Sequence, residues 1–239
     1  MKESFLTPDE CLRYSRQLKL DGFGEECQMR LRGSRVLVIG AGALGSPVAL
    51  YLAAAGVGHI DIADGDSVDL SNLQRQIIHR TADLSRPKAV SAMEKMSALN
   101  PEIEVRATEA FATADNIGPL VAAADFVVDA TDSLDAKFLI DDACHEVRKP
   151  YSHGAVRGYE GQTMTVVPGS ATYRDLFPDG PELIERVAMT GPLGVVPGII
   201  GAIQAAEAVK CLAGIGDLLT DSLLRFNALT MNFQKIRLR

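Results

Sequence analysis

The feature that most constrains the fold is a short apolar run that leads directly into glycines and a second apolar stretch. Residues 35–45 are RVLVIGAGALG, and residues 46–56 are SPVALYLAAAG. A short run of β-branched residues predicts a buried parallel strand, and the second stretch predicts a helix that ends at Gly56. A strand, a glycine turn and a helix in this order predict one unit of an α/β sheet.

The same alternation continues along the chain. Further strands are predicted in HIDIAD, IEVRATEA and DFVVDATD, and helices in residues 8–32, RPKAVSAMEKMSALN and LDAKFLIDDACHEVRK. After Pro150 we expect two antiparallel strands in YSHGAVRGYEGQTMTVVPG, a loop at 168–190, a buried helix in IIGAIQAAEAVKCLAG and a last strand in LLRFNAL. We therefore predict one α/β domain over residues 1–239. Its Rossmann-like parallel sheet is extended by antiparallel strands and carries helices on both faces.

The glycine turn has the spacing GxGxxG. Gly40, Gly42 and Gly45 permit a tight turn and close approach of the backbone to a phosphate, which the N-terminus of the following helix attracts. Asp64 ends the next predicted strand, 19 residues after Gly45, where a carboxylate typically binds a ribose hydroxyl. The pattern predicts a nucleotide with an unmodified ribose, and the turn alone leaves open which nucleotide.

A polar run, SNLQRQ, follows the second strand and is unexpected in a dehydrogenase. Arg75 in this run and Lys88 beyond it are candidate clamps for the negative charges of a triphosphate. Asn72 and Gln74 are candidates for hydrogen bonds to phosphate or sugar oxygens. Asp132 follows the fourth strand and offers the hard oxygen ligand that Mg²⁺ prefers. These residues follow the carboxyl ends of strands, the usual ligand crevice of such sheets.

Composition excludes some classes of function. The net charge is −7 and the pI is near 5.1, so we expect no nucleic-acid partner. The longest apolar run, residues 191–203, is short and holds two prolines, so we expect no membrane segment. The N-terminus lacks the apolar core of a signal peptide, and the four cysteines form no CxxC pair. These features predict a cytoplasmic protein with reduced thiols.

Several segments together resemble the E1-like activating enzymes of the ThiF/MoeB/HesA family, over nearly the whole chain. The segments are RYSRQLKLDGFG (13–24), residues 36–79, RPKA (86–89), VVDATDS (127–133) and GPLGVVPGIIGAIQAAEAVK (191–210). Members of that family are homodimers that use ATP and Mg²⁺ to adenylate the C-terminal glycine of a small ubiquitin-like sulfur carrier. The resemblance therefore implies a carrier that ends in Gly-Gly, with pyrophosphate as the released product.

The resemblance also assigns roles to residues. It implies catalytic roles for Arg16, Arg75, Lys88 and Asp132; Arg16 would reach into the partner subunit's site, and Asp132 would hold Mg²⁺ through ATP. We expect the nucleotide-binding part at about residues 33–150 and the carrier-binding and dimer part at about 151–239. The implied ATP contacts are Gly40, Gly42, Ala43, Gly45, Asp64, Ser71, Asn72, Leu73, Gln74, Arg75, Lys88, Asp132 and Ser133.

The chain departs from the family at two places. Many members bind zinc through two CxxC pairs, but Thr172 and Asp175 stand at the positions of the first pair, and the C-terminal segment has no cysteine. We therefore expect no structural zinc. Some members also have a cysteine in the loop 180–190, where this chain has Val187. A thiol intermediate in that loop is thus not expected, while adenylation is unaffected.

Other candidate side chains have simpler interpretations. Cys144 and Cys211 lie in helical patterns and are expected in the core. His79 follows the polar run, and a structural role is favoured over a phosphate contact. His153 and Arg157 lie beside a glycine-containing turn and receive no role.

Alternative functions remain open from the sequence. The same family fold activates carboxylates that are not proteins, such as a modified tRNA base, although the acidic charge argues against this. A catalytically silent carrier-binding module is a second alternative, against which the intact cationic set argues. A third is an NAD-dependent oxidoreductase, which has no use for SNLQRQ and Lys88.

Overall fold

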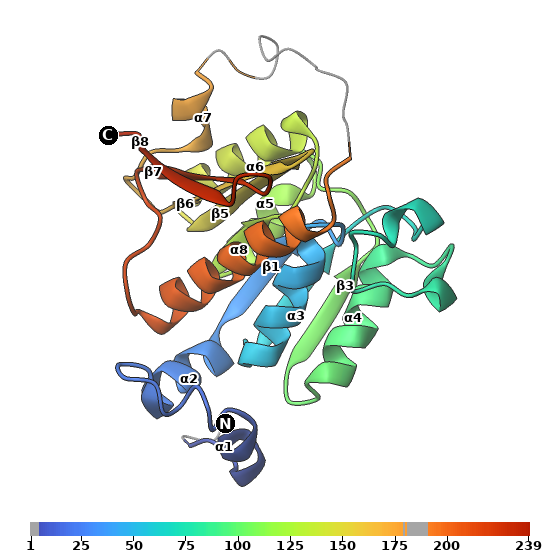
Figure 1. The fold of residues 1–239 in the computed structure, drawn as a ribbon. Helices are drawn as coiled ribbons and strands as arrows, with labels where there is room; N and C mark the ends of the chain where they lie inside the picture. The colour runs from blue at the N-terminus through green and yellow to red at the C-terminus, as the bar shows by residue number, and fades with distance from the viewer. Residues whose placement is uncertain (1–4, 179, 181–190) are drawn as a thin grey trace.

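The computed structural model describes residues 5–178, 180 and 191–239. Within them, eight strands form one sheet (Figure 1). The strands are β1 Arg35–Ile39, β2 His59–Ala63, β3 Glu104–Thr108, β4 Phe126–Asp129, β5 Tyr151–Arg157, β6 Glu160–Val166, β7 Ser222–Asn227 and β8 Asn232–Arg237. Their order in the sheet is β3-β2-β1-β4-β5-β6-β7-β8. Strands β1 to β5 pair in parallel, and β5 to β8 pair antiparallel, so the predicted fold class is confirmed.

Helices cover both faces of the sheet (Figure 1). Helices α2, α3, α4 and α8 share one apolar core with the sheet, and α5 and α6 share the other. The helices are α1 Pro8–Arg13, α2 Gly24–Gly33, α3 Gly45–Ala55, α4 Lys88–Leu99, α5 Ile117–Ala123, α6 Leu134–Glu146, α7 Tyr173–Leu176 and α8 Val195–Ala213, with 3-10 turns η1 Leu70–Asn72 and η2 Thr81–Asp83.

The alternation of side chains along β1 explains the two cores. Val36 and Val38 enter the core under α3 and α8, whereas Leu37 and Ile39 enter the core under α5 and α6. All four are nearly inaccessible to solvent. A strand covered on both faces must be apolar at every position, which is why RVLVI lacks a polar alternation.

Helix α8 is the one helix of the described residues whose length and composition would allow it to cross a membrane. It has 19 residues and is longer than the apolar run at residues 191–203, from which we expected no membrane segment. In the structure it packs against α2, α3, β5 and β6. This packing accounts for its apolar composition, because a helix covered on several sides is apolar nearly all round.

The structure corrects two predictions at the element level and adds two elements. Residues 8–32 do not form one helix: Gly22 and Gly24 have φ values of +76° and +61°, and they separate α1 from α2. The predicted loop at 168–190 contains the short helix α7, which Thr172 caps. Helix α5 and strand β8 were not predicted from the sequence. β8 is an edge strand whose side chains are mostly exposed, so it has no apolar alternation.

Candidate active site

The glycine turn lies between β1 and α3 and is closely packed on one side. Gly40 has φ +102°, and a Cβ there would lie 2.6 Å from the carbonyl oxygen of Ala130. A Cβ on Gly45 would lie 1.9 Å from the carbonyl oxygen of Gly40. Gly42 is different, because its nearest neighbour, Nε2 of Gln76, would lie 3.5 Å away. Gly40 and Gly45 are therefore required by the turn itself, whereas a methyl group on Gly42 would make an ordinary van der Waals contact with Gln76.

The carboxylate of Asp64 fixes this turn. Its Oδ2 accepts a hydrogen bond from the backbone N–H of Ala41 at 2.7 Å, and its Oδ1 accepts one from the N–H of Asp66 at 2.8 Å. Each oxygen still has acceptor capacity. Asp64 thus shapes the turn and can also accept a hydrogen bond from a ribose hydroxyl.

Lys88 is the first residue of α4 and lies next to Asp66. Its Nζ forms an ion pair with Oδ2 of Asp66 at 2.8 Å, and its backbone N–H donates to the Asp66 carbonyl at 2.9 Å. The Lys88 side chain is 8% exposed and that of Asp66 is 55% exposed. Hydrogen bonds therefore connect the glycine turn, through Asp64 and Asp66, to Lys88.

The polar run begins in η1 and forms a locally capped turn. The N–H and Oγ–H of Ser71 both donate to Asp69 Oδ1, and these bonds lower the Asp69 pKa. The Asn72 Oδ1 accepts from the Asp69 N–H at 3.3 Å. The Arg75 Nη1 donates to the Ser71 carbonyl at 3.0 Å, and no ion pair joins Arg75 to any described carboxylate. The guanidinium of Arg75 is therefore held in place without being neutralised.

The GPLG segment lies against this polar run. A Cβ on Gly194 would lie 2.2 Å from the carbonyl oxygen of Gln74, so only glycine allows this approach. The N–H of Leu193 donates to the Gly158 carbonyl at 2.9 Å. Two segments that carry the sequence resemblance, far apart in the chain, thus pack together. Gln74 is exposed, and Ala43 and Leu73 are partly buried.

His79 contacts the backbone of the glycine turn. Its Nε2 lies 2.9 Å from the Ala41 carbonyl oxygen, and its Nδ1 lies 2.9 Å from the Ser91 Oγ. Burial lowers the pKa of His79. Both ring nitrogens are occupied by the protein, so the expected structural role is confirmed.

Asp132 follows β4 on the other side of the turn. It is exposed, and no hydrogen bond or ion pair joins it to another residue that the structure describes. The next residue, Ser133, caps α6 by accepting from the Ala136 N–H at 3.2 Å. The preceding carboxylate, Asp129, is 1% exposed and is bound by Lys137 and His153. Of the two acidic residues in VVDATDS, only Asp132 is available to a cation.

Arg16 does not join these residues. Its neighbour Gln17 donates to the Ala55 carbonyl at 2.9 Å, at the end of α3. Tyr14 accepts from Asn100 at 2.8 Å, just after α4. Both helices start at the site and are about 16 Å long or longer, so Arg16, whose neighbours bind their far ends, lies away from the glycine turn. The connection between α1 and α2, which carries Arg16, lies on that side of the molecule (Figure 1).

Three contributions were missed in the sequence. Asp66 is the partner of Lys88, and the pattern DGD at 64–66 could have indicated it. Gln76 lies over Gly42 and is buried, and its Oε1 has no hydrogen-bond partner within the described part of the chain. The cluster of Lys137, Asp129 and His153 could not be found from spacing, because each comes from a different element.

Thr172 and Asp175, expected in place of zinc ligands, form a capping box at α7. The described residues include no group of three or more His, Cys, Asp or Glu able to hold a metal ion. The absence of zinc remains a prediction. Val187 lies outside the described residues.

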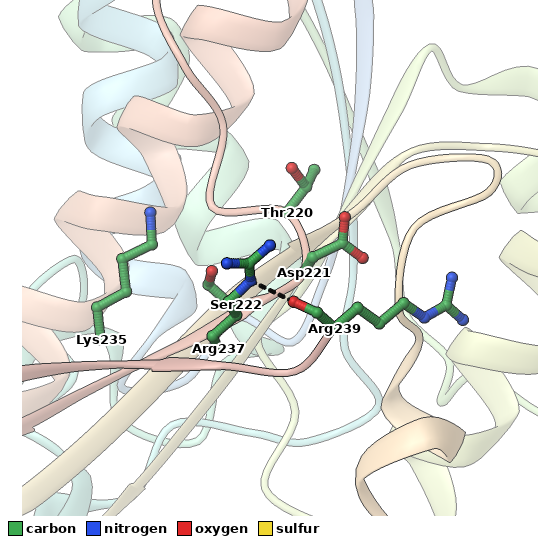
Figure 2. Close-up of a pocket in the computed structure, with 6 residues that line it drawn as sticks. All are labelled: Thr220, Asp221, Ser222, Lys235, Arg237 and Arg239. Carbon is green, nitrogen blue, oxygen red and sulfur yellow. Dashed lines mark hydrogen bonds between the residues drawn. The ribbon is translucent and has the colours of Figure 1, made fainter.

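A surface hollow lies on the antiparallel part of the sheet, between the start of β7 and the end of β8 (Figure 2). Arg237 donates to the Arg239 carbonyl there, and Arg239 pairs with Asp175 at 3.0 Å. Strands β4 to β7 separate β8 from β1, and no predicted site residue lines this hollow. It is not part of the candidate site.

The fold is shared with known structures. The chain superposes on PaaA with a TM-score of 0.82, covering 100% of this chain and 76% of that chain at 22% identity. Against Escherichia coli MccB with ATP the TM-score is 0.82, covering 95% of this chain and 70% of that chain at 21% identity. At these identities the likeness concerns the fold alone.

Curated relatives are closer in sequence. The chain is 44% identical to the SAMP-activating enzyme E1 of Haloferax volcanii over 229 residues, 95% of this chain and 85% of that protein. It is 44% identical to the adenylyltransferase and sulfurtransferase MOCS3-1 of Zea mays, over 98% of this chain and 51% of that protein. For the probable adenylyltransferase/sulfurtransferase MoeZ of Mycobacterium tuberculosis, the identity is 41%, over 99% and 62% respectively. The chain thus spans about half the length of the maize relative. Since the ThiF family model also matches residues 14–239, the chain belongs to the ThiF family.

Proposed function

We propose that this chain adenylates the C-terminal glycine carboxylate of a small ubiquitin-like sulfur-carrier protein, using ATP and releasing pyrophosphate. The Haloferax volcanii relative is named a SAMP-activating enzyme E1, and the maize and mycobacterial relatives are named adenylyltransferase and sulfurtransferase, which supports this proposal. The carrier tail is expected to end in Gly-Gly. Because the reaction consumes ATP, we place the protein in the cytoplasm.

The observation that carries this proposal is the glycine turn with two cationic side chains, Lys88 and Arg75, in the polar segments beside it. The turn lies at the start of α3, Lys88 is linked to it through Asp64 and Asp66, and Arg75 has no carboxylate partner within the described residues. Such a set can bind and neutralise phosphates. It does not need a side-chain nucleophile, since a carboxylate substrate supplies its own.

The chain's residues then act by positioning and by charge. The carrier carboxylate attacks the α-phosphorus, the bond between that phosphorus and the α,β-bridging oxygen breaks, and pyrophosphate leaves with the electron pair of that bond. Lys88 and Arg75 stabilise the negative charge that develops on the phosphates. Asp64 holds the ribose, and the backbone N–H groups at the start of α3 bind phosphate oxygens. Fixing both reactants at one site provides a further part of the acceleration.

Mg²⁺ fits the site through Asp132. This exposed carboxylate has no partner among the described residues, and a hard oxygen ligand beside a phosphate is what Mg²⁺ prefers. Asp129 does not fit, because Lys137, His153 and Thr131 already occupy its oxygens. When bound, Mg²⁺ neutralises phosphate charge.

We further propose that the active form is a homodimer in which Arg16 serves the partner's site. Arg16 is exposed, and its neighbours bind the far ends of α3 and α4. It is therefore too distant for its own site, whereas a second copy could receive it. Residues 33–150 would then bind the nucleotide, and residues 151–239 would bind the carrier and contribute to the dimer.

The test is intact-mass analysis of a carrier ending in Gly-Gly after incubation with this protein, ATP and Mg²⁺. We expect an added AMP on the carrier and carrier-dependent exchange of pyrophosphate into ATP. The same carrier without its last glycine is the matched control and should give neither. No adduct and no exchange with several intact carriers would overturn the proposal.

A further inference from the structure

A buried charged cluster lies beneath the loop that carries Asp132. The side chains of Lys137, Asp129 and His153 are 4%, 1% and 0% exposed, respectively. Burying an ammonium and a carboxylate costs several kcal/mol before their attraction is counted, and an apolar pair of similar shape is often equally stable. Stability alone is therefore a weak reason for this cluster.

The Lys137 ammonium is directed at the backbone near Asp132. It donates to Asp129 Oδ2 at 3.0 Å, to the Thr131 carbonyl at 2.8 Å and to the Gly154 carbonyl at 2.6 Å. An ammonium has three N–H groups, so all its donors are used. Lys137 thus ties the residue before Asp132 to both β4 and β5.

The backbone of Asp132 is held from both sides, while its side chain has no hydrogen bond or ion pair to another described residue. On one side, Thr131 donates its N–H and its Oγ–H to Asp129 Oδ1, at 3.1 and 2.6 Å. On the other side, the Ser133 carbonyl accepts from the Lys137 N–H at 3.2 Å, and its Oγ caps α6. The backbone of the single residue between them is therefore fixed.

His153 completes the arrangement from β5. Its Nδ1 lies 3.0 Å from Asp129 Oδ2, and its Nε2 lies 3.4 Å from the Gln162 Nε2, which can only donate. This assigns a neutral ring that carries its proton on Nδ1. The ring packs against Tyr173 with centroids 4.5 Å apart. His153 therefore holds the Asp129 carboxylate in the orientation that Thr131 and Lys137 require.

We propose that Lys137, held by Asp129 and His153, is a positioning residue that fixes the Asp132 backbone for Mg²⁺-dependent binding of ATP. This inference rests on the proposed function, in particular on the role of Asp132. It adds that the availability of Asp132 to the metal depends on a cluster that contacts neither metal nor nucleotide. Such indirect support is expected wherever a ligand must be held rigidly in a loop.

The test is calorimetric binding of ATP to the full chain, with Mg²⁺ and with EDTA. The variant is Asp129→Asn with Lys137→Met, which removes both charges and so avoids an uncompensated buried ion. We expect the gain in ATP affinity that Mg²⁺ provides to fall about tenfold, as for a lost supporting contact. Affinity in EDTA should be unchanged. Asp132→Ala should abolish the gain, and adding the double change to it should have no further effect.

The matched control is Glu207→Gln with Lys210→Met. Glu207 is also a buried carboxylate, 2% exposed, that pairs with a lysine of its own helix, but it lies in α8 and bonds Thr165 and Leu219. This control should keep the full gain from Mg²⁺. If the Asp129/Lys137 variant does not fold, Thr131→Val removes one donor to Asp129 and should show a smaller loss of the same kind.

The outcomes separate this inference from the proposed function. A folded variant with the wild-type gain from Mg²⁺ overturns the positioning role and leaves the proposed function intact. Equal losses in the control pair also overturn it. Wild-type ATP binding that does not respond to Mg²⁺ overturns both the inference and the assigned role of Asp132.

Discussion

Two sets of charged side chains, one at the glycine turn and one buried beneath the loop that carries Asp132, differ in how many of their polar atoms have hydrogen-bond partners in the protein. Around the glycine turn, Asp132 has no hydrogen-bond or ion-pair partner among the described residues, and within the same part of the chain Arg75 donates only to the Ser71 carbonyl. Beneath them, Asp129 and Lys137 have every donor and most acceptors occupied. Polar side chains that lack partners at the carboxyl ends of the strands indicate a site for a ligand. Buried polar side chains whose hydrogen bonds are made within the protein indicate a structural role. The same residue types thus serve two purposes.

The largest expected effect follows from removing a cation at the open site. Lys88→Ala or Arg75→Ala should reduce carrier adenylation by about 10²–10³-fold, because each removes charge that stabilises the transition state. Pyrophosphate exchange measures the loss, and circular dichroism should show an unchanged fold. Lys210→Ala is a matched control, since Lys210 is also ion-paired but lies near the end of α8. Wild-type turnover in either site variant would remove that residue from the clamp.

Gly45 and Gly42 of the glycine turn should respond differently to a methyl group. Gly45→Ala places a Cβ 1.9 Å from the Gly40 carbonyl oxygen, so the backbone must move, and we expect a loss of about 3 kcal/mol in the free energy of unfolding. Gly42→Ala meets only Gln76 Nε2, at 3.5 Å. It should change stability by less than about 0.5 kcal/mol.

ATP binding should reverse that order of tolerance. In Gly42→Ala the methyl group fills space over the turn, so ATP affinity should fall although the protein remains stable. Urea unfolding and calorimetry measure the two quantities. Equal stability losses in the two variants, or normal ATP affinity in Gly42→Ala, would contradict the assignment of Gly42 to the ligand side.

The position of Arg16 predicts complementation between subunits. Arg16→Ala and Lys88→Ala should each be nearly inactive alone. After unfolding and refolding as an equal mixture, half of the dimers are mixed, and each mixed dimer has one site with both residues intact. About a quarter of wild-type activity should therefore return. No recovery, in a mixture shown by mass to contain mixed dimers, would rule out action across subunits.

The parts of the fold that could be predicted are those with strong local patterns. Strands β1 and β4 are almost wholly buried, β2 has buried apolar residues at Ile60, Ile62 and Ala63, and Gly56 ends α3 with φ +82° as the sequence indicated. Strand β8 escaped prediction because it is an exposed edge strand that is stabilised by pairing with β7. The break between α1 and α2 depends on two glycines with positive φ, whose effect the apolar periodicity concealed.

The candidate site likewise contains residues whose position could be predicted from the sequence and residues whose position could not. Asp64, Arg75 and Lys88 all belong to the connection from β2 to the start of α4, so their place at the carboxyl ends of the strands follows from the topology alone. The support beneath them joins β4, α6 and β5, and no spacing in the sequence links Asp129 to His153. The distance between Arg16 and the glycine turn likewise required the lengths of α3 and α4.

The smallest expected effect concerns the pH dependence of stability, which the buried groups should dominate. Burial lowers the pKa of His79 and of His153 below its usual value. Below about pH 6.5 the unfolded chain binds protons at these positions and the native protein does not. Stability should therefore begin to fall as the pH drops through this value.

A second decline should follow in acid. Burial alone would raise the pKa of Asp129, but Lys137 and His153 outweigh it and hold the pKa at about 2. For Asp83, burial is likewise outweighed by Lys95 and the Arg80 N–H, and the pKa is again about 2. Depressed carboxyl values give stability that is present above about pH 4 and is lost as the pH falls toward the native pKa. A shift of this size corresponds to roughly 2 kcal/mol for one group.

Urea unfolding between about pH 2 and pH 8 would measure both declines. Asp83→Asn should be less stable at neutral pH, yet its curve should be flatter in acid, because one of the linked carboxylates is gone. Asp132→Asn is the matched control at the open site, since this carboxylate has no partner among the described residues whose loss could depend on pH. Its curve should follow that of the wild type. If both variants flatten the curve equally, the distinction between satisfied support and an unsatisfied ligand site would fail for these carboxylates.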